Sequence, residues 1–122
     1  MIINGNNLPN KVNVLGEVYK FFYDTEEHDQ KMKGNDGYTE PVEKEIHIEK
    51  SIFEDHTNDI HTVKNLAKYG RKVIRHEIVH AFIEESGLAE CNDWARSEEL
   101  VDWIARQFPK MMKCFIEAGV AE

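Results

Sequence analysis

The chain has 122 residues, of which 15 are Lys or Arg and 23 are Asp or Glu, so its formal net charge is -8 at pH 7. This length suits one domain with one hydrophobic core, and we expect residues 1–122 to form it. The acidic balance argues against nucleic acid as a partner, because neutralising phosphates needs a basic surface. With 41% apolar and 31% charged residues, the composition excludes the disordered and fibrous classes.

The sequence also argues against export and membrane insertion. No apolar run approaches the roughly 20 residues of a membrane-spanning helix, and the start, MIINGNNLPN, lacks the charged and apolar regions of a signal peptide. Cys91 and Cys114 form no CxxC pair and are too few for a disulfide framework. We expect both to be reduced, with Cys114 packed on a helix. These features predict a cytoplasmic protein.

The first predicted elements are strands. Residues 12–23, VNVLGEVYKFFY, hold two β-rich runs around Gly16-Glu17, a pattern typical of a short hairpin. Residues 24–37 are polar, include two glycines and predict a loop. Residues 45–49 alternate isoleucine with polar residues, which indicates a half-buried strand.

The remaining predicted elements are helical. Ser51 followed by Glu54 resembles a capping box and predicts a helical turn after that strand. The main helix is expected to begin between residues 57 and 63 and to run to Ser86, with Gly87 as its C-terminal stop.

Gly70 is a position where the main helix can bend. A further helix is expected to begin near Asn92 or Asp93 and to stop before Pro109, because proline cannot continue a helix. Residues 110–118 then predict a short final helix. The basic residues of the main helix are expected to form one solvated edge: Lys68, Arg71, Lys72 and Arg75.

The main helix carries polar residues inside an apolar stretch. From position 73 to position 83 most residues are apolar, as in a buried helix, and each unpartnered polar group buried there costs on the order of 1–3 kcal/mol. His76 and His80 lie one turn apart, about 40° on the helical wheel, so their imidazoles can reach one point. Glu77 is close enough for its carboxylate to address a water held at that point.

A zinc ion would explain why these residues are buried together. Two neutral imidazoles are standard zinc ligands, and an adjacent Glu can act as general base on zinc-bound water, which is the HExxH pattern. His76 and His80 are therefore candidate ligands of one Zn²⁺, and Glu77 is the candidate catalytic base. The alternative interpretation is a pair of core histidines held by hydrogen bonds to backbone or carboxylate groups.

A catalytic zinc needs a third protein ligand and one position left for water. The extended motif HExxHxxGxxH fails here, because Ile83 and Ser86 stand at its Gly and last His positions. The third ligand must therefore come from further along the chain, and residues 94–108 offer three carboxylates.

Two of these carboxylates border the apolar arc of the predicted helix, namely Glu98 and Asp102. We assign Glu98 as the third ligand. Asp102, one turn later, is expected to accept the free N–H of a ligand histidine, which would fix the tautomer and orientation of that ring. Glu99 lies about 100° round from Glu98, on the polar face. Glu99 as the ligand, and Asp102 as a surface carboxylate without a metal role, remain open.

Other candidate ligands have weaker support. Cys91 is a zinc ligand by chemistry, but its position in a loop leaves its orientation unpredictable. The remaining histidines occur singly, without ligand spacing, and are expected to be solvated: His28, His47, His56 and His61.

These motifs resemble those of the zincin metallopeptidases that use glutamate as third ligand, whose signature is HExxH followed by ExxxD on a later helix. The chain has HEIVH at 76–80 and EELVD at 98–102, which fits every fixed position. The stretches RHEIVHAFIEESGL and EELVDWIARQFPK are similar to small phage or prophage zincin-like proteins and, more distantly, to the ImmA/IrrE-like peptidases. The likeness covers about the second half of the chain, with GYTE and EIHIEK as weaker support.

The resemblance implies an α+β fold in which a small antiparallel sheet packs on the HExxH helix and on a following helix with the third ligand. His76, His80 and Glu98 would hold one Zn²⁺, Glu77 would be general base and proton shuttle, and the strand around residues 46–48 would line the cleft.

The reaction that the resemblance implies is hydrolysis of a peptide bond in a protein or peptide substrate. Larger members have Asn before the ligand Glu, where this chain has Ser97, and use a distant His or Tyr to stabilise the oxyanion. Tyr38 is a candidate for that role. The leading alternative is a metal-binding interaction protein without turnover, because so short a chain can build few specificity subsites.

Overall fold

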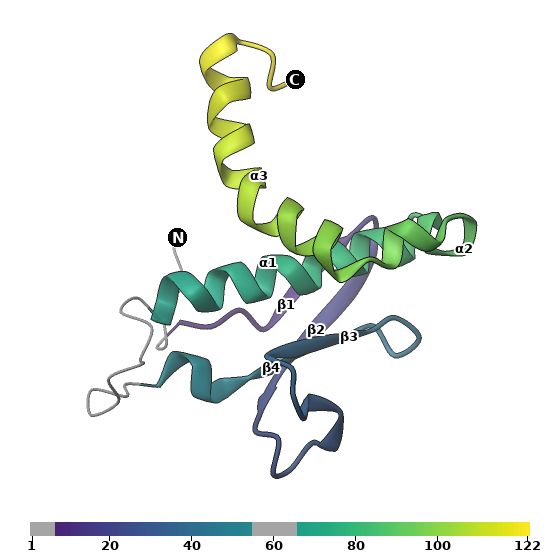
Figure 1. Ribbon diagram of the computed structural model, residues 1–122, viewed down its shortest axis with the longest axis vertical. Helices are drawn as coiled ribbons and strands as arrows, with labels where there is room; N and C mark the ends of the chain where they lie inside the picture. Colours follow the sequence, from purple (N-terminus) through teal and green to yellow (C-terminus); the bar gives the residue numbers. More distant parts are fainter. Residues whose placement is uncertain (1–6, 55–65) are drawn as a thin grey trace.

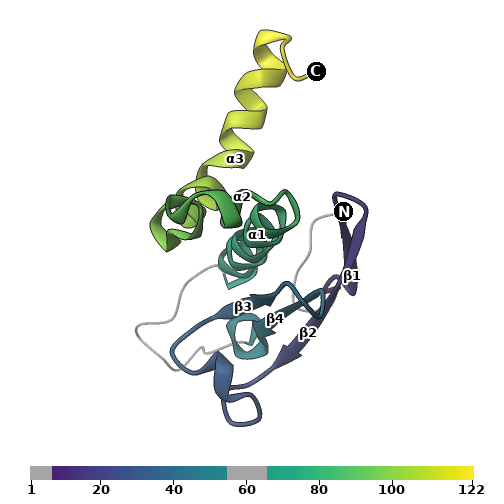
Figure 2. The same ribbon diagram turned by 90° about the vertical axis from the view of Figure 1, so that its right-hand side faces the viewer.

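The computed structural model describes residues 7–54 and 66–122 and shows an α+β fold (Figure 1). Helix α1 lies between a four-stranded sheet on one side and helix α3 on the other (Figure 2). The expected start of the main helix, between residues 57 and 63, lies outside the described residues. The elements follow in the order β1 (Lys11–Val14), β2 (Glu17–Asp24), η1 (Gln30–Met32), β3 (Gly37–Glu40), β4 (Glu45–Glu49), η2 (Lys50–Phe53), α1 (Leu66–Glu85), α2 (Leu88–Cys91), η3 (Asp93–Arg96) and α3 (Glu98–Ala118).

The sheet is mixed, whereas the resemblance implied an antiparallel one. Its strand order is β1-β2-β4-β3. β1 pairs with β2, and β3 with β4, in antiparallel fashion, but β2 and β4 run parallel, with Phe21 opposite Ile46. Parallel neighbours need a crossover connection. Here the crossover passes through η1 and then β3, which forms the outer edge and leaves β4 inside the sheet.

The predicted hairpin is confirmed. Its turn residues, Leu15 and Gly16, have φ values of 52° and 93°, the positive values that a two-residue type I′ turn requires. The side-chain Oδ1 of Asn13 accepts a hydrogen bond from the N–H of Gly16 at 2.8 Å. The turn lies one residue earlier than expected, because Glu17 already pairs with Val14.

The core lies between the sheet and α1. The strand predicted from its alternating isoleucines is confirmed as β4, and both Ile46 and Ile48 are fully buried. α1 is not covered all round, since Phe82 is 43% exposed. The buried members of the main core are Val14, Tyr19, Phe21, Ile46, Ile48, Ile52, Val73, Ile74 and Ala81. A smaller cluster joins α1 to the elements that follow it, through Ile83, Ala89, Ala95 and Val101.

The predicted helical turn after β4 is confirmed as η2, but its cap differs. The carboxylate of Glu49, and not the hydroxyl of Ser51, caps the turn, since it accepts a hydrogen bond from the N–H of Ser51 at 3.1 Å. Phe53, at the end of η2, lies against Gly70 of α1, where a Cβ would collide with the phenyl ring. Gly70 therefore allows close packing, and α1 continues through it without a break. The predicted stop is confirmed as well, because Gly87 follows α1 with a φ of 78°.

Residues 98–118 form one helix, where two helices separated by Pro109 were expected. Proline has no N–H, so the carbonyl of Ala105, four residues earlier, loses its helical donor. The Nε of Arg75, on α1, donates to that carbonyl at 2.7 Å. This hydrogen bond from a neighbouring helix satisfies the freed carbonyl, and α3 runs on to Ala118 before Gly119 ends it with a φ of 74°.

The first half of α3 packs on the body and the second half projects away from it (Figures 1 and 2). Val101 and Ala105 are buried, whereas Phe108 and Ile116 are exposed. The helix is thus anchored by its N-terminal half.

The cysteines and the helices can be compared with the predictions about disulfides and membrane insertion. Cys91 and Cys114 are both free, as expected, but Cys114 is exposed on α3 and not packed. Within residues 7–54 and 66–122, no helix has both the length and the apolar character to cross a membrane.

Candidate metal centre

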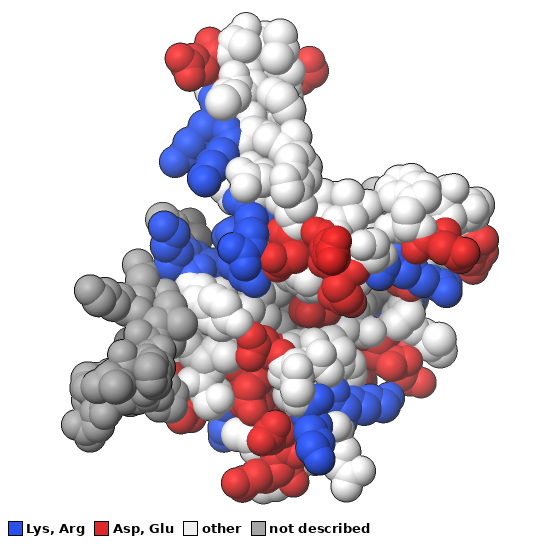
Figure 3. Space-filling view, in the orientation of Figure 1, with Lys and Arg blue, Asp and Glu red and all other residues white. Residues whose placement is uncertain are grey.

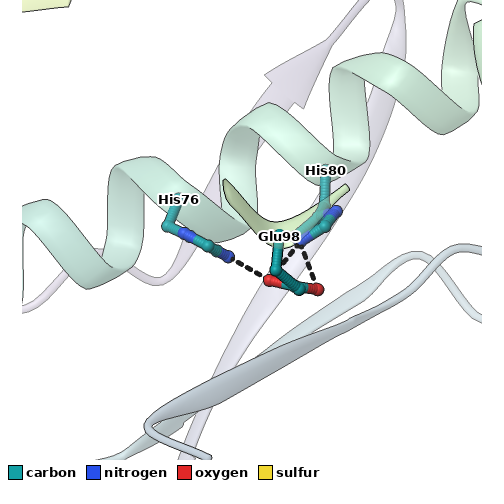
Figure 4. A group of neighbouring side chains, drawn as sticks. All are labelled: His76, His80 and Glu98. Carbon is teal, nitrogen blue, oxygen red and sulfur yellow. Dashed lines mark hydrogen bonds and ion pairs between the residues drawn. The ribbon is translucent and has the colours of Figure 1, made fainter. Parts of the chain in front are cut away.

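Two imidazoles and one carboxylate converge between α1 and α3 (Figure 4). His76 and His80 project from α1, one turn apart, and Glu98 is the first residue of α3. The Nε2 of His76 lies 2.8 Å from Oε2 of Glu98, and the Nε2 of His80 lies 3.1 Å from Oε1 and 3.3 Å from Oε2. In the described part of the chain, these residues form a group whose possible ligand atoms all lie within 4.8 Å of one another. The structure therefore brings together the three residues predicted as ligands.

The donor set fits a zinc ion. Tetrahedral zinc with bonds of about 2.0–2.1 Å places its ligand atoms about 3.3 Å apart. The observed separations between imidazole nitrogens and carboxylate oxygens, 2.8 to 3.3 Å, need small side-chain movements to match that value. The side chain of Glu98 is 72% exposed, so solvent reaches the group. Two imidazoles and one carboxylate are also the protein ligands of catalytic zinc sites that keep a fourth position for water.

These contacts also show that the polar side chains of α1 are not buried without partners, as the sequence alone suggested. In the described residues, no buried side-chain nitrogen or oxygen lacks a hydrogen-bond partner. The histidines face carboxylates, so they need no ion to offset an unsatisfied group. The case for a metal rests on donor type and geometry.

Glu98 owes its position to the start of α3. The hydroxyl of Ser97 accepts a hydrogen bond from the N–H of Leu100 at 3.4 Å and caps the helix, which fixes Glu98 in the first turn. Burial opposes ionisation, but the hydrogen bond with His76 and the nearby charge of His80 together hold the pKa of Glu98 below its ordinary value. Glu99, the open alternative, is exposed and does not line the cleft described below.

Asp102 lies behind His76, one turn after Glu98. Its Oδ1 is 3.2 Å from the Nδ1 of His76 and accepts from the Nζ of Lys72 at 3.0 Å, while its Oδ2 accepts from the Nε of Arg106 at 2.6 Å. Burial opposes ionisation, but the hydrogen bonds from Arg106 and Lys72 outweigh it and hold the pKa of Asp102 far below its ordinary value. The ionised carboxylate can accept Nδ1–H of His76, which leaves Nε2 free to bind a metal.

Glu77 follows His76 on α1 and is 5% exposed. The hydroxyl of Thr39 on β3 lies 3.0 Å from Oε1 of Glu77 and 2.9 Å from its carbonyl oxygen. Gly37 leaves room for this side chain, since a Cβ at position 37 would lie 3.2 Å from its Cγ. Burial raises the pKa of Glu77, against the lowering effect of the two imidazoles. A buried carboxylate with a raised pKa beside the metal-ligand candidates has the properties of a general base.

A cleft of about 450 Å³ lies between β3 and the two helices, and the metal-ligand candidates line it. The space-filling view shows the hollow beneath α3, with acidic side chains around it (Figure 3). The expected lining strand, residues 46–48, is not part of the lining, because β4 is an inner strand with its isoleucines in the core. The edge strand β3 takes that place.

Tyr38 turns its hydroxyl away from the metal-ligand candidates. The hydroxyl donates to Oδ2 of Asp29 at 2.6 Å, and the ring stacks on that of His47 with 4.6 Å between centroids. Because Gly37 and Thr39 face Glu77, the alternation of a strand places the Tyr38 side chain on the opposite face of the sheet. Its expected role at the oxyanion does not agree with this position.

The weaker ligand candidates do not join the group. His28 and Cys91 are exposed. His47 is not solvated as expected, since its ring is stacked between two aromatic rings and its side chain is 18% exposed. His56 and His61 lie outside the described residues.

Four residues that shape the site were not predicted. Thr39 and Gly37 lie in GYTE, a run too short for a strand signal, although its small residues at alternate positions mark a face that another element can approach closely. Lys72 and Arg75 were expected on a solvated edge, but both reach across to α3. Their partners come from the other helix, which the pattern of α1 alone cannot reveal.

Comparisons of the chain with protein-family models, with curated proteins and with solved structures find no match.

Proposed function

We propose that the protein is a zinc-dependent metallopeptidase that hydrolyses peptide bonds of cytoplasmic proteins or peptides. The observation that carries this proposal is the convergence of His76, His80 and Glu98 on a cleft, with the buried carboxylate of Glu77 beside them. When bound there, zinc supplies a Lewis acid that lowers the pKa of its water to about 7 and polarises the peptide carbonyl.

We assign a separate role in this reaction to each of three residues of the site. Glu77 would take a proton from the water that attacks the carbonyl carbon and would pass it to the leaving amine when the C–N bond breaks. The hydroxyl of Thr39, 3.0 Å from Oε1, holds the carboxylate in place and leaves Oε2 for the water. Asp102, 3.2 Å from the Nδ1 of His76, keeps that ring oriented with Nε2 toward the cleft.

The edge strand β3 suits an extended peptide. The N–H of Glu49 donates to the carbonyl of Asp36 at 2.8 Å, so by the alternation of an antiparallel ladder Tyr38 is the next residue bonded to β4. The N–H and C=O groups of Gly37 and Thr39 then point to the open edge. A substrate strand can pair with these groups beside the metal-ligand candidates.

Replacement of the base tests the proposal. The Glu77→Gln variant is expected to retain one zinc per chain by mass spectrometry. Its hydrolysis of a fluorogenic peptide library is expected to fall by about 10²–10⁴-fold, the usual contribution of general-base catalysis. Wild-type rates in this variant would remove Glu77 from the mechanism.

Replacement of the ligands tests the site itself. His76→Ala and Glu98→Ala are expected to lose the metal, because a catalytic zinc site has three protein ligands. Glu99→Ala is the matched control, since it removes the neighbouring carboxylate on the same helix turn and is expected to keep the ion. Metal loss in His76→Ala without loss in Glu98→Ala would place the third ligand elsewhere.

A metal-binding interaction protein on the same scaffold is the second candidate. The observation that favours it is the position of Tyr38, whose hydroxyl is bonded to Asp29 and not directed to the cleft. Zinc bound at 1:1 in the wild type with no hydrolysis of any library peptide would decide for this candidate.

A further inference from the structure

The long axis of the cleft follows α1, because β3 runs alongside that helix. The hydroxyl of Tyr69, early in α1, donates to the carboxylate of Asp36, just before β3. Thr39 then meets Glu77, and Lys44 after the strand meets Glu85 near the end of the helix. An extended peptide on the edge of β3 would therefore follow the axis of α1 past the metal-ligand candidates.

Acidic side chains stand at both ends of this path. Asp36 lines the cleft at the end near Lys72, and Glu84 lines it at the other end, beyond His80. Positions 72 and 84 are about 18 Å apart along a helix that rises 1.5 Å per residue, and an extended peptide covers that length in about five residues.

Among the described lining residues, Asp36 and Glu84 are the carboxylates whose charge is least compensated. Lys72, the one cation among the described lining residues, is paired with Asp102 at 3.0 Å. Glu77 and Glu98 would face the two positive charges of a zinc ion. The partner of Asp36 is a neutral hydroxyl, and the cation near Glu84 is Arg96, at 3.9 Å with its side chain 61% exposed.

The lining also offers little for an apolar side chain. Apart from Tyr38, its apolar members are Val73, which is 4% exposed, and Pro41. Charge and hydrogen bonding must therefore provide most of the selectivity of this surface.

We propose, on the basis of the function proposed above, that the cleft selects peptides with Lys or Arg on both sides of the scissile bond, two to three residues away. Asp36 receives the basic side chain at one end and Glu84 the one at the other. Both are specificity-determining residues and neither takes part in bond cleavage.

The test uses two sets of three blocked, internally quenched peptides of one sequence. One set has Lys, Gln or Glu at the third position before the centre, and the other set has them at the third position after it. The ratio of kcat/KM is expected to favour Lys over Gln by about 2- to 5-fold for each end, as for exposed ion pairs. The preference is expected to shrink as salt rises from about 0.02 to 0.5 M, because salt screens exposed charges.

Single variants test which acidic residue contacts the basic side chain at each end of the cleft. Glu84→Gln and Asp36→Asn are each expected to remove the preference at one end, and Glu84→Lys is expected to reverse it to favour Glu there. Glu117→Gln is the matched control, since it makes the same charge change on the projecting half of α3 and is expected to leave the ratio unchanged. Equal effects of the control and the cleft variants would overturn the assignment.

Binding separates this proposal from the peptidase proposal. The affinity of zinc-loaded Glu77→Gln for the peptides of both sets, measured by fluorescence anisotropy, needs no turnover. A preference for Lys in binding with no wild-type hydrolysis would refute the peptidase and leave the selectivity standing. Hydrolysis of the peptides of both sets at equal kcat/KM would refute the selectivity alone, and absence of both binding and hydrolysis would refute both.

Discussion

The guanidinium of Arg75 allows α3 to pass through Pro109. Its Nε donates to the carbonyl of Ala105, which Pro109 cannot serve. Burial, and then the charge of Arg71, lowers the pKa of Arg75, in keeping with a cation held partly out of water between two helices. Without this donor, the carbonyl would be left unsatisfied beside α1.

A double-variant cycle tests that contact. Arg75→Met is expected to lower the free energy of unfolding by about 1–3 kcal/mol, the cost of an unsatisfied buried acceptor. Pro109→Ala restores an N–H for the Ala105 carbonyl, so the loss caused by Arg75→Met is expected to shrink by at least about 0.5 kcal/mol in the double variant. Urea denaturation of the four proteins measures both values, and strictly additive losses would contradict the contact.

The residues of the site differ in how far the sequence could predict them. His76, Glu77 and His80 lie on one helix, where spacing alone fixes their relative directions. Glu98 and Asp102 follow from the same rule applied to the next helix. The contact of Arg75 with Ala105 joins residues 30 positions apart, so no local pattern could show that Pro109 is tolerated inside a helix.

Among the elements, the C-terminal end of α1 is tied to the sheet through Glu85. Its carboxylate accepts the hydroxyl of Tyr19 on β2 at 2.7 Å and pairs with Lys44, which precedes β4. The hydrogen bond from Lys44, followed by that from Tyr19, holds the pKa of Glu85 below its ordinary value. The ionised form is therefore favoured in the folded state.

This shift makes a pH-dependent contribution to stability. A carboxylate with a lowered folded pKa stabilises the fold above its unfolded pKa, about 4.3 for Glu, and loses that effect as pH falls through the folded pKa. Glu85→Gln is expected to be less stable than wild type at pH 7, with a difference that shrinks below about pH 4. Urea midpoints from pH 3 to 7 measure it, and a constant difference would exclude the ionised carboxylate as the cause.

The secondary-structure elements also differ in how far local sequence patterns predict them. The β1–β2 hairpin and β4 have local signals, namely turn residues and alternating isoleucines. β3 has four residues, all of intermediate burial, so it lacks the alternation of buried and less buried side chains that marks β4. The parallel pairing of β2 with β4 depends on where the crossover returns the chain, and that is decided by long-range packing.

For the whole molecule, a bound ion would link the two helical layers. His76 and His80 belong to α1 and Glu98 to α3, so the ion would hold α3 against α1. Zinc at 100 times its dissociation constant is expected to add about 2.7 kcal/mol to stability, a rise in Tm of roughly 10 °C, and chelation is expected to reverse it. Calorimetry with and without chelator measures the shift. Glu99→Ala should retain it, and an equal shift in Glu98→Ala would show that the ion binds elsewhere.

The projecting half of α3 gives the particle an uneven distribution of mass. A compact chain of 122 residues has a radius of gyration of about 14 Å. Residues 110–122 extend away from the body (Figure 1), and mass far from the centre enters that radius as the square of its distance. Small-angle X-ray scattering of the monomer is expected to give a larger radius and a skewed pair-distance distribution. A radius of the compact value would mean that this half of α3 folds back in solution.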